Sequence, residues 1–147
     1  MCVFLNTDGA VHPMSGLSAV GSVIRNSKRE WILGYNRFLG ECSIATAELW
    51  GVLDGLLILQ KQGYDEVIIQ SNSLENVISI NDSKMAFEEK WSLNYAPRDT
   101  NRVADALAKM ALSSAESLNI IEEPPLEIKE ILKNDSTPVN LFMTSSL

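Results

Sequence analysis

Hydrophobic and polar residues alternate along three short stretches near the start of the chain. Val3–Ala10 ends in a turn at Asp8-Gly9, and 18–25 and 31–38 are two further runs. Alternation with a period of two is typical of strands that have one buried face. Short polar loops separate the runs, so we predict an antiparallel meander of three strands.

The spacing of apolar residues then changes to that of an amphipathic helix between residues 44 and 62. Ser43 can cap the start of this helix, and Gly63 stands where a left-handed residue would end it. Downstream we predict a buried strand at 67–69 and a short helix at 74–80.

Further along, we predict a strand at 90–95, which Pro97 prevents from continuing, and a second clear helix at 101–112. The order β-β-β-α-β-α-β-α predicts an α/β domain, residues 1–115, with a five-stranded mixed sheet. Residues 116–147 are acidic, contain Pro124-Pro125 and lack a sustained period, so we expect a flexible C-terminal tail.

The net charge of −7 is spread over both parts of the chain. Residues 1–115 carry 13 acids and 10 bases, and residues 116–147 carry 6 acids and 2 bases. Neither part is the basic body of a protein that binds nucleic acid by bulk electrostatics. Any such contact would have to be local, or carried by metal ions between phosphates and carboxylates.

The chain has no apolar run long enough for a membrane span and no signal peptide, and its two cysteines form no metal-binding spacing. We therefore expect an intracellular protein with reduced cysteines, in nucleus or cytoplasm.

Three acidic residues stand out by position: Asp8 ends the first strand, and Glu48 and Asp105 lie early in the two long helices. Each alone has an ordinary explanation, because Asp before Gly is common in turns and early helical acids complement the macrodipole.

Together these residues carry a resemblance to a known family. Three segments resemble three blocks of the type 1 ribonuclease H fold. They are Thr7-Asp8-Gly9-Ala10, Ala47-Glu48-Leu49-Trp50 and the run 101–109, Asn-Arg-Val-Ala-Asp-Ala-Leu-Ala-Lys. The version most similar is the plant retroelement-derived, reverse-transcriptase-like branch. The resemblance covers residues 3–112, and the three segments follow one another in the same order as the blocks of the family.

The resemblance implies a chemistry and a set of ligands. That family holds two Mg²⁺ ions between four carboxylates and hydrolyses the RNA strand of RNA–DNA hybrids, and carboxylate oxygen suits this hard ion. On this pattern Asp8 is the central catalytic and metal-binding residue, with Glu48 and Asp105 beside it.

Two positions depart from the family pattern. Asn72 stands where the third carboxylate is expected, at the end of the fourth strand, and an amide oxygen brings no charge. Tyr95 stands where the family often has a histidine, and an unperturbed tyrosine is a poor proton shuttle near neutral pH. Both departures predict weak or absent cleavage.

A third departure is length, since only 33 positions separate Asn72 from Asp105 and one family helix has no room. Its loss should uncover apolar surface on one side of the sheet, where a protein partner could bind.

The remaining candidates are weaker. Possible nucleic-acid contacts are Ser71, Ser73, Arg98, Asn101 and Arg102, with Arg25 and Arg37 as further arginines that could reach phosphates. The three tryptophans are expected in the core, and His12 on the surface. Three functions stay open: a feeble hybrid ribonuclease, a non-catalytic nucleic-acid-binding module, and a protein-interaction module.

Overall fold

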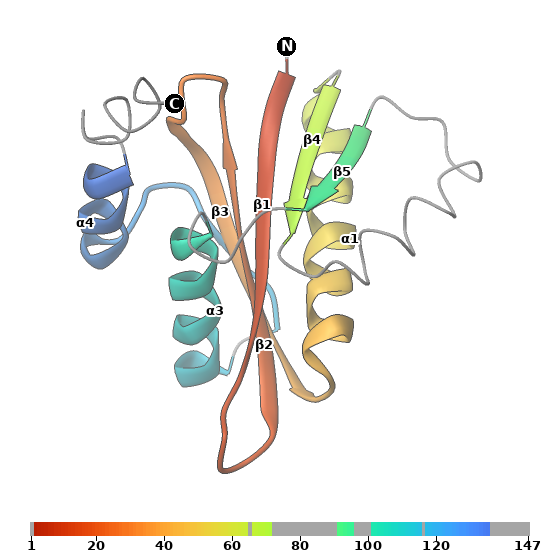
Figure 1. Ribbon diagram of the computed structural model, residues 1–147, viewed down its shortest axis with the longest axis vertical. Helices are drawn as coiled ribbons and strands as arrows, with labels where there is room; N and C mark the ends of the chain where they lie inside the picture. The colour runs from red at the N-terminus through yellow and green to blue at the C-terminus, as the bar shows by residue number, and fades with distance from the viewer. Residues whose placement is uncertain (1, 65, 72–90, 96–100, 116, 136–147) are drawn as a thin grey trace.

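The computed structural model describes residues 2–64, 66–71, 91–95, 101–115 and 117–135, with the backbone alone for 91–95 and 134–135 (Figure 1). The elements in chain order are β1 (Cys2–Val11), β2 (Leu17–Arg25), β3 (Trp31–Glu41), α1 (Ile44–Gln62), β4 (Glu66–Ser71), β5 (Trp91–Tyr95), α3 (Arg102–Ser114), β6 (Asn119–Ile121) and α4 (Leu126–Asp135).

The strands form one mixed sheet in the order β5-β4-β1-β2-β3-β6. The first three strands are the antiparallel meander predicted from the alternation, while β4 runs parallel to β1 and β5 runs parallel to β4. The predicted α/β class and mixed sheet are therefore confirmed.

Helix α1 begins and ends where its caps predict. The Ser43 hydroxyl accepts a hydrogen bond from the Thr46 backbone N–H at 3.1 Å. Gly63 adopts φ 76°, the left-handed conformation that ends a helix with least strain in glycine.

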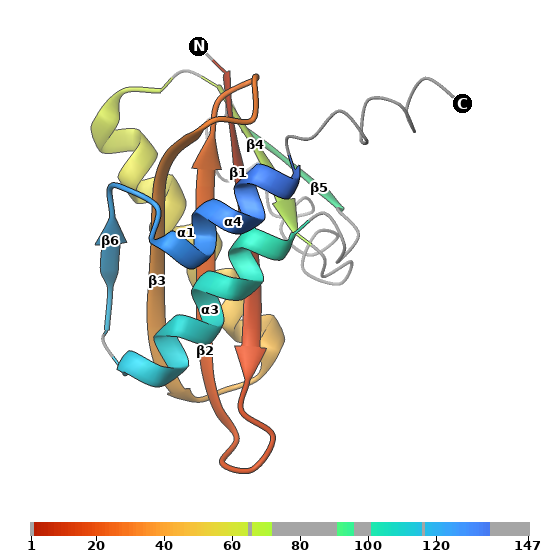
Figure 2. The same ribbon diagram turned by 90° about the vertical axis from the view of Figure 1, so that its left-hand side faces the viewer.

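The two long helices cover opposite faces of the sheet (Figure 1). Beneath α1 lies a core that includes Leu5, Ile24, Tyr35 and Ile69. On the other face α3 packs with α4 over a smaller core, whose buried residues are Val23, Val103, Leu107 and Ile128. Figure 2 shows α4 lying alongside α3 on this face.

The prediction of a flexible C-terminal tail is wrong for its described part, residues 117–135. β6 pairs with the edge strand β3, giving a sixth strand where five were expected. The Trp31 indole N–H donates to the Glu122 backbone carbonyl at 2.9 Å, and Ile128 of α4 is fully buried. Acidic residues hide the apolar spacing of α4, and a three-residue strand has too few positions to show alternation. Residues 136–147 lie outside the described residues.

The short helix expected at 74–80 and the missing family helix also fall outside the described residues. Within the part of the chain that is described, no helix is long and apolar enough to cross a membrane.

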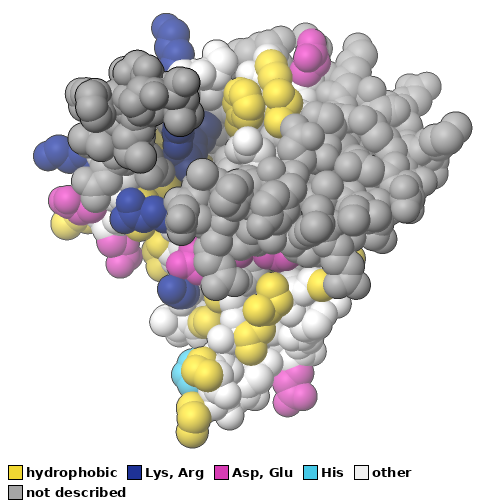
Figure 3. Space-filling model, viewed as in Figure 1, with side chains coloured by type: hydrophobic (Ala, Val, Ile, Leu, Met, Phe, Trp, Pro, Cys, Tyr) yellow, Lys and Arg dark blue, Asp and Glu magenta, His cyan; other side chains and the backbone are white. Residues whose placement is uncertain are grey.

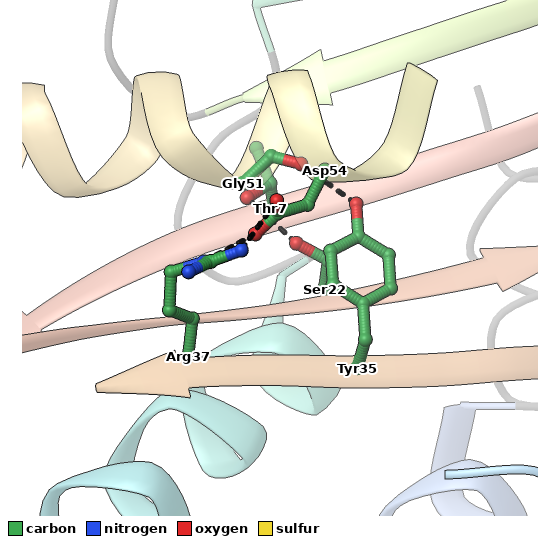
Figure 4. Close-up of polar contacts among 6 residues, drawn as sticks. All are labelled: Thr7, Ser22, Tyr35, Arg37, Gly51 and Asp54. Carbon is green, nitrogen blue, oxygen red and sulfur yellow. Dashed lines mark hydrogen bonds and ion pairs between the residues drawn. The ribbon is translucent and has the colours of Figure 1, made fainter. Parts of the chain in front are cut away.

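A buried polar network fixes α1 to the sheet (Figure 4). The Tyr35 hydroxyl donates to the Gly51 carbonyl at 2.7 Å, and the Ser22 hydroxyl donates to that of Thr7 at 2.9 Å. Burial raises the pKa of Tyr35 well above its ordinary value, because the charged phenolate would lose its hydration.

At the rim of this network Arg37 makes two hydrogen bonds to Asp54, of 2.7 and 2.9 Å. These bonds raise the pKa of Arg37, since they favour its charged form.

Candidate active site

The three acids of the predicted site lie on three different elements. Asp8 is on β1 and Glu48 is in α1, and both are buried, with 4% and 2% of their surfaces exposed. Asp105 lies in the first turn of α3, and its side chain is 37% exposed.

Both long helices contact β1 within the three residues around Asp8. From α1, the Glu48 carboxylate accepts a hydrogen bond from the Gly9 backbone N–H at 3.3 Å. At the start of α3, the Asn101 side-chain amide donates to the Thr7 carbonyl at 2.7 Å. The tertiary structure thus brings residues 48 and 101 to the two neighbours of Asp8.

The register of the sheet shows which face Asp8 occupies. Asp8 is paired with Gly21, and a Cβ at Gly21 would collide with the backbone of Leu107 and Ala108 in α3. Because paired residues of an antiparallel ladder point to the same face, Asp8 points to the face that carries α3. Asp105 is supplied from that face, and Glu48 from the helix on the other.

Asn101 connects β1 to the first turn of α3. Its backbone carbonyl accepts from the Asp105 N–H at 3.0 Å, while its side chain reaches Thr7. Asparagine is a common residue at the position before a helix, where it caps the first turn, but the Asn101 side chain makes no capping hydrogen bond. Its Oδ1 is buried and has no hydrogen-bond partner among the described residues. The sequence signal, an asparagine one turn before Asp105, identified the position but not this role.

The metal-binding set is not assembled in the described residues. Asp105 forms an ion pair with Lys109, 2.9 Å away and one helical turn further along α3. Among these residues, no three His, Cys, Asp or Glu side chains lie close enough to hold an ion together. The structure therefore gathers Asp8 and Glu48 around Gly9 and leaves Asp105 paired with a lysine.

Of the two predicted degenerate positions, the structure describes Tyr95, whose strand β5 is separated from β1 by β4. Ser71, at the end of β4, pairs with Thr7 on one side and with Tyr95 of β5 on the other. Asn72 follows Ser71 directly in the chain, and it lies outside the described residues together with Ser73 and Arg98. Ser71 is buried, and Arg102 is exposed at the start of α3.

The expectations for three other side chains, Trp50, Arg37 and Arg25, need correction. Trp50 is 41% exposed rather than part of the core, because it lies on the outer side of α1. Arg37 stacks over the Trp50 ring at 4.8 Å and forms an ion pair with Asp54. Its positive charge is therefore balanced by Asp54 and is poorly suited to a phosphate contact. Arg25 is buried and thus poorly placed for phosphate. His12 is exposed as expected, and its Nδ1 accepts from the N–H groups of Met14 and Ser15.

The charged side chains are unevenly spread over the face seen in Figure 3. Lys and Arg side chains lie mainly on the left of this view, where acidic side chains lie among them, and further acidic groups lie near the centre and on the right.

The arrangement of β1, α1 and α3 agrees with comparisons to known proteins. Residues 6–93 match the family described as reverse transcriptase-like. The chain belongs to the reverse transcriptase-like family. It is 29% identical over 151 aligned residues to an Arabidopsis thaliana protein named "putative ribonuclease H protein", an alignment covering 91% of this chain. This chain spans about a quarter, 24%, of that relative's length.

Solved structures show the same fold. Ribonuclease H1 of the archaeon Halobacterium salinarum superposes with a TM-score of 0.64 at 22% identity, covering 78% of this chain and 99% of the archaeal one. The N-terminal ribonuclease H domain of a Mycobacterium tuberculosis protein gives 0.68 at 20% identity, covering 78% and 95%. LC11-RNase H1 in complex with an RNA/DNA hybrid gives 0.64 at 24% identity, covering 77% and 98%. The reverse transcriptase-like chain therefore has a ribonuclease H-like fold.

Proposed function

We propose that this domain binds RNA–DNA hybrids and retains at most feeble, metal-dependent hydrolysis of the RNA strand. The observation that carries the proposal is the meeting of Glu48 and Asn101 at the two neighbours of Asp8. Two of the expected carboxylates are thereby buried beside one short piece of backbone. The hybrid bound by LC11-RNase H1, a structure of the same fold, supports this class of ligand.

Magnesium fits the donor chemistry of the site only in part. Carboxylate oxygens of Asp8, Glu48 and Asp105 are the ligands that would hold the ion, which would polarise the phosphate and activate water. Because Asp105 is paired with Lys109 and no three-carboxylate group is present in the described part, we derive no reaction step through a metal.

The two departures from the family set the expected activity. With Asn72 in place of a carboxylate, less negative charge is available to hold two dications. Loss of such electrostatic stabilisation costs several kcal/mol of barrier, or several powers of ten in rate. Tyr95 would add a smaller loss, because its hydroxyl does not exchange protons near neutral pH as histidine does.

A cleavage assay tests the proposal directly. The full 147-residue chain is incubated with a labelled RNA–DNA hybrid in Mg²⁺ and then in Mn²⁺, beside an Asp8→Ala control. We expect a slow product signal above the control, or hybrid binding without product. Absence of both hybrid binding in gel-shift titration and product would rule out the proposed function.

Restoration of the missing charge separates a decayed enzyme from a binding module. We expect Asn72→Asp to raise cleavage at least about tenfold, since each 1.4 kcal/mol of barrier is one power of ten. Gln60→Glu, which adds the same charge at an exposed position of α1, should change nothing. If Asn72→Asp binds hybrid but produces no cleavage, the alternative stands: a non-catalytic nucleic-acid-binding module of ribonuclease H fold.

A further inference from the structure

The Asn101 side chain lies wholly inside the protein, between β1 and the start of α3. Its exposed fraction is 0%, whereas asparagine is mostly found at protein surfaces. A bound nucleic acid could touch this side chain only if the start of α3 opened. The position is therefore poorly suited to a direct nucleic-acid contact, and the buried amide needs another explanation.

The hydrogen bond of this amide does not serve the helix on which it lies. The side chain makes no capping hydrogen bond to α3, and its Nδ2 donates instead to the Thr7 carbonyl at 2.7 Å. Its Oδ1 is buried without a hydrogen-bond partner among the described residues. A buried polar atom without a partner is unfavourable. Asn101 therefore makes its bond to β1 although a serine that capped the helix would avoid this unfavourable burial.

The Thr7 carbonyl is part of the backbone next to Asp8. It belongs to the planar peptide group that also contains the N–H of Asp8, so a hydrogen bond to this oxygen restrains the whole group. The described ladder between β1 and β4 ends at Thr7 and Ser71. Asn101 therefore binds β1 at the point where the described pairing with its neighbour β4 stops.

The main chain of Asn101 makes a second connection, to Asp105. Its carbonyl accepts a hydrogen bond from the Asp105 N–H at 3.0 Å, in the first turn of α3. The Asp105 carboxylate itself is held only weakly, because 67% of the side chain of its partner Lys109 is exposed and exposed ion pairs contribute little. The location of Asp105 thus depends on how the start of α3 is fixed.

We propose that Asn101 is a positioning residue, which holds the Asp105 end of α3 against Asp8 so that the two carboxylates can bind one divalent cation. Asp8 points to the sheet face that carries α3, and Asp105 lies on that face. This role rests on the proposed function, because it matters only if the two carboxylates share an ion. Mutating a residue that orients metal ligands without touching the metal typically lowers metal affinity by about 10–100-fold.

A second buried asparagine provides a matched control. Asn36 of β3 is 2% exposed, and its Nδ2 donates to the Leu107 carbonyl of the same helix at 2.9 Å. Both asparagines join the sheet to α3 by one amide-to-carbonyl hydrogen bond. Only the bond of Asn101 ends on the peptide group of Asp8. The pair therefore separates the positioning of the two acids from the general attachment of the helix.

A titration of the full chain with Mg²⁺, followed by NMR, tests the role without any need for catalytic activity. Mg²⁺ binds carboxylate oxygen, so the side-chain carboxyl carbon signals of Asp8 and Asp105 report its binding at each acid. In the native protein we expect both signals to shift along one common curve with one Kd. Asp8→Ala, which removes one of the two ligands, should abolish the shift of the Asp105 signal at the same Mg²⁺ concentrations.

Asn101→Ser is the main variant. Serine is a good helix cap, so α3 should be retained, but its hydroxyl ends one bond closer to the backbone than the Asn101 amide and should not reach Thr7. We expect the Kd for Mg²⁺ to rise by about 10–100-fold, and the Asp105 signal to leave the curve that the Asp8 signal follows. Asn101→Ala should behave alike, and Asn36→Ser should keep the common curve and the native Kd.

Three results would overturn the role of Asn101 and leave the proposed function intact. One is a native Kd with a common curve in both Asn101 variants. Another is an equal rise of the Kd in Asn36→Ser, since α3 would then need only firm attachment. The third is loss of folding in both Asn101 variants, because the residue would then serve the fold itself. If the native protein shows no Mg²⁺ binding that Asp8→Ala removes, the metal-dependent hydrolysis of the proposed function fails together with this role.

Discussion

Helices α1 and α3 both pack on the central sheet, but they differ in how their outer sides are finished. The buried residues of α3 are Val103, Ala104, Leu107, Ala108 and Ala111, which form a single stripe. That stripe meets the sheet, and α4 lies next to it with Ile128 in the same small core. Helix α1 instead has a buried side and an outer side on which Leu49, Trp50, Leu53 and Leu57 are exposed.

Among the described residues, the difference shows that the α3 face is covered by further elements, whereas the outer side of α1 is not. On the α3 face, residues 117–135 add the strand and helix that cover the edge and the small core. On the α1 face, four large apolar side chains stay exposed although the sheet beneath them is filled. The hydrophobic surface of α1 is therefore larger than the part that the other described residues bury.

The largest expected loss of stability comes from adding a side chain at Gly21, where β2 packs against α3. A Cβ there would overlap the backbone of Ala104 and Ala108, and would lie 2.7 Å from the carbonyl carbon of Leu107. Because a helix backbone cannot yield locally, we expect Gly21→Ala to lower the free energy of unfolding by about 3 kcal/mol or more. Urea denaturation measures this loss, and a change below about 1 kcal/mol would show that α3 sits further from β2.

Gly55→Ala is the corresponding change on the α1 face. There the new Cβ would meet side chains, those of Tyr35 and Leu5, rather than backbone. The helix also gains up to about 1 kcal/mol from replacing an interior glycine. We expect the net loss of stability to be smaller than for Gly21→Ala, and the reverse order would contradict the comparison.

The next effect tests how firmly α4 completes its face. Ile128→Ala removes a fully buried side chain, so we expect a loss of about 2–3 kcal/mol in the free energy of unfolding. Leu126→Ala, two residues earlier and 77% exposed, should stay within about 0.5 kcal/mol of the native protein. Equal small effects in both variants would mean that α4 contributes little to the fold.

The smallest expected loss of stability comes from removing the hydroxyl of Tyr35, the buried tyrosine beneath α1. Tyr35→Phe removes the hydrogen bond to the Gly51 carbonyl, which we expect to cost about 1 kcal/mol near neutral pH.

The same variant should alter the dependence of stability on pH. Burial raises the folded-state pKa of Tyr35, so its stabilising contribution is complete below the unfolded value of about 10 and declines as pH rises above that value. We expect the native protein to lose stability above pH 10 by up to about 1.4 kcal/mol per pH unit more than Tyr35→Phe. Tyr64→Phe is the control, and identical pH profiles for all three proteins would contradict the assignment.

Short-range patterns account for most of the fold that was predictable. Alternation along β1, β2 and β3 depends on neighbouring residues, and the two ends of α1 depend on Ser43 and Gly63. β6 and α4 were not predictable in this way, because their packing on Trp31 and Val23 joins segments about 100 positions apart.

The candidate site also has features that were predictable from the sequence and features that were not. The residue types and order of the blocks around Asp8, Glu48 and Asp105 identified the family from the sequence alone. The sequence also specified the charge lost at Asn72, since residue identity determines charge wherever the chain places it.

Only the tertiary structure decided which groups meet. It joined Glu48 to Gly9 and Asn101 to Thr7, paired Asp105 with Lys109, and left Trp50 on an exposed uncharged face. The physical reason is that local propensity acts over a few residues, whereas these contacts follow from the sheet register and from the side of each helix that packs on it.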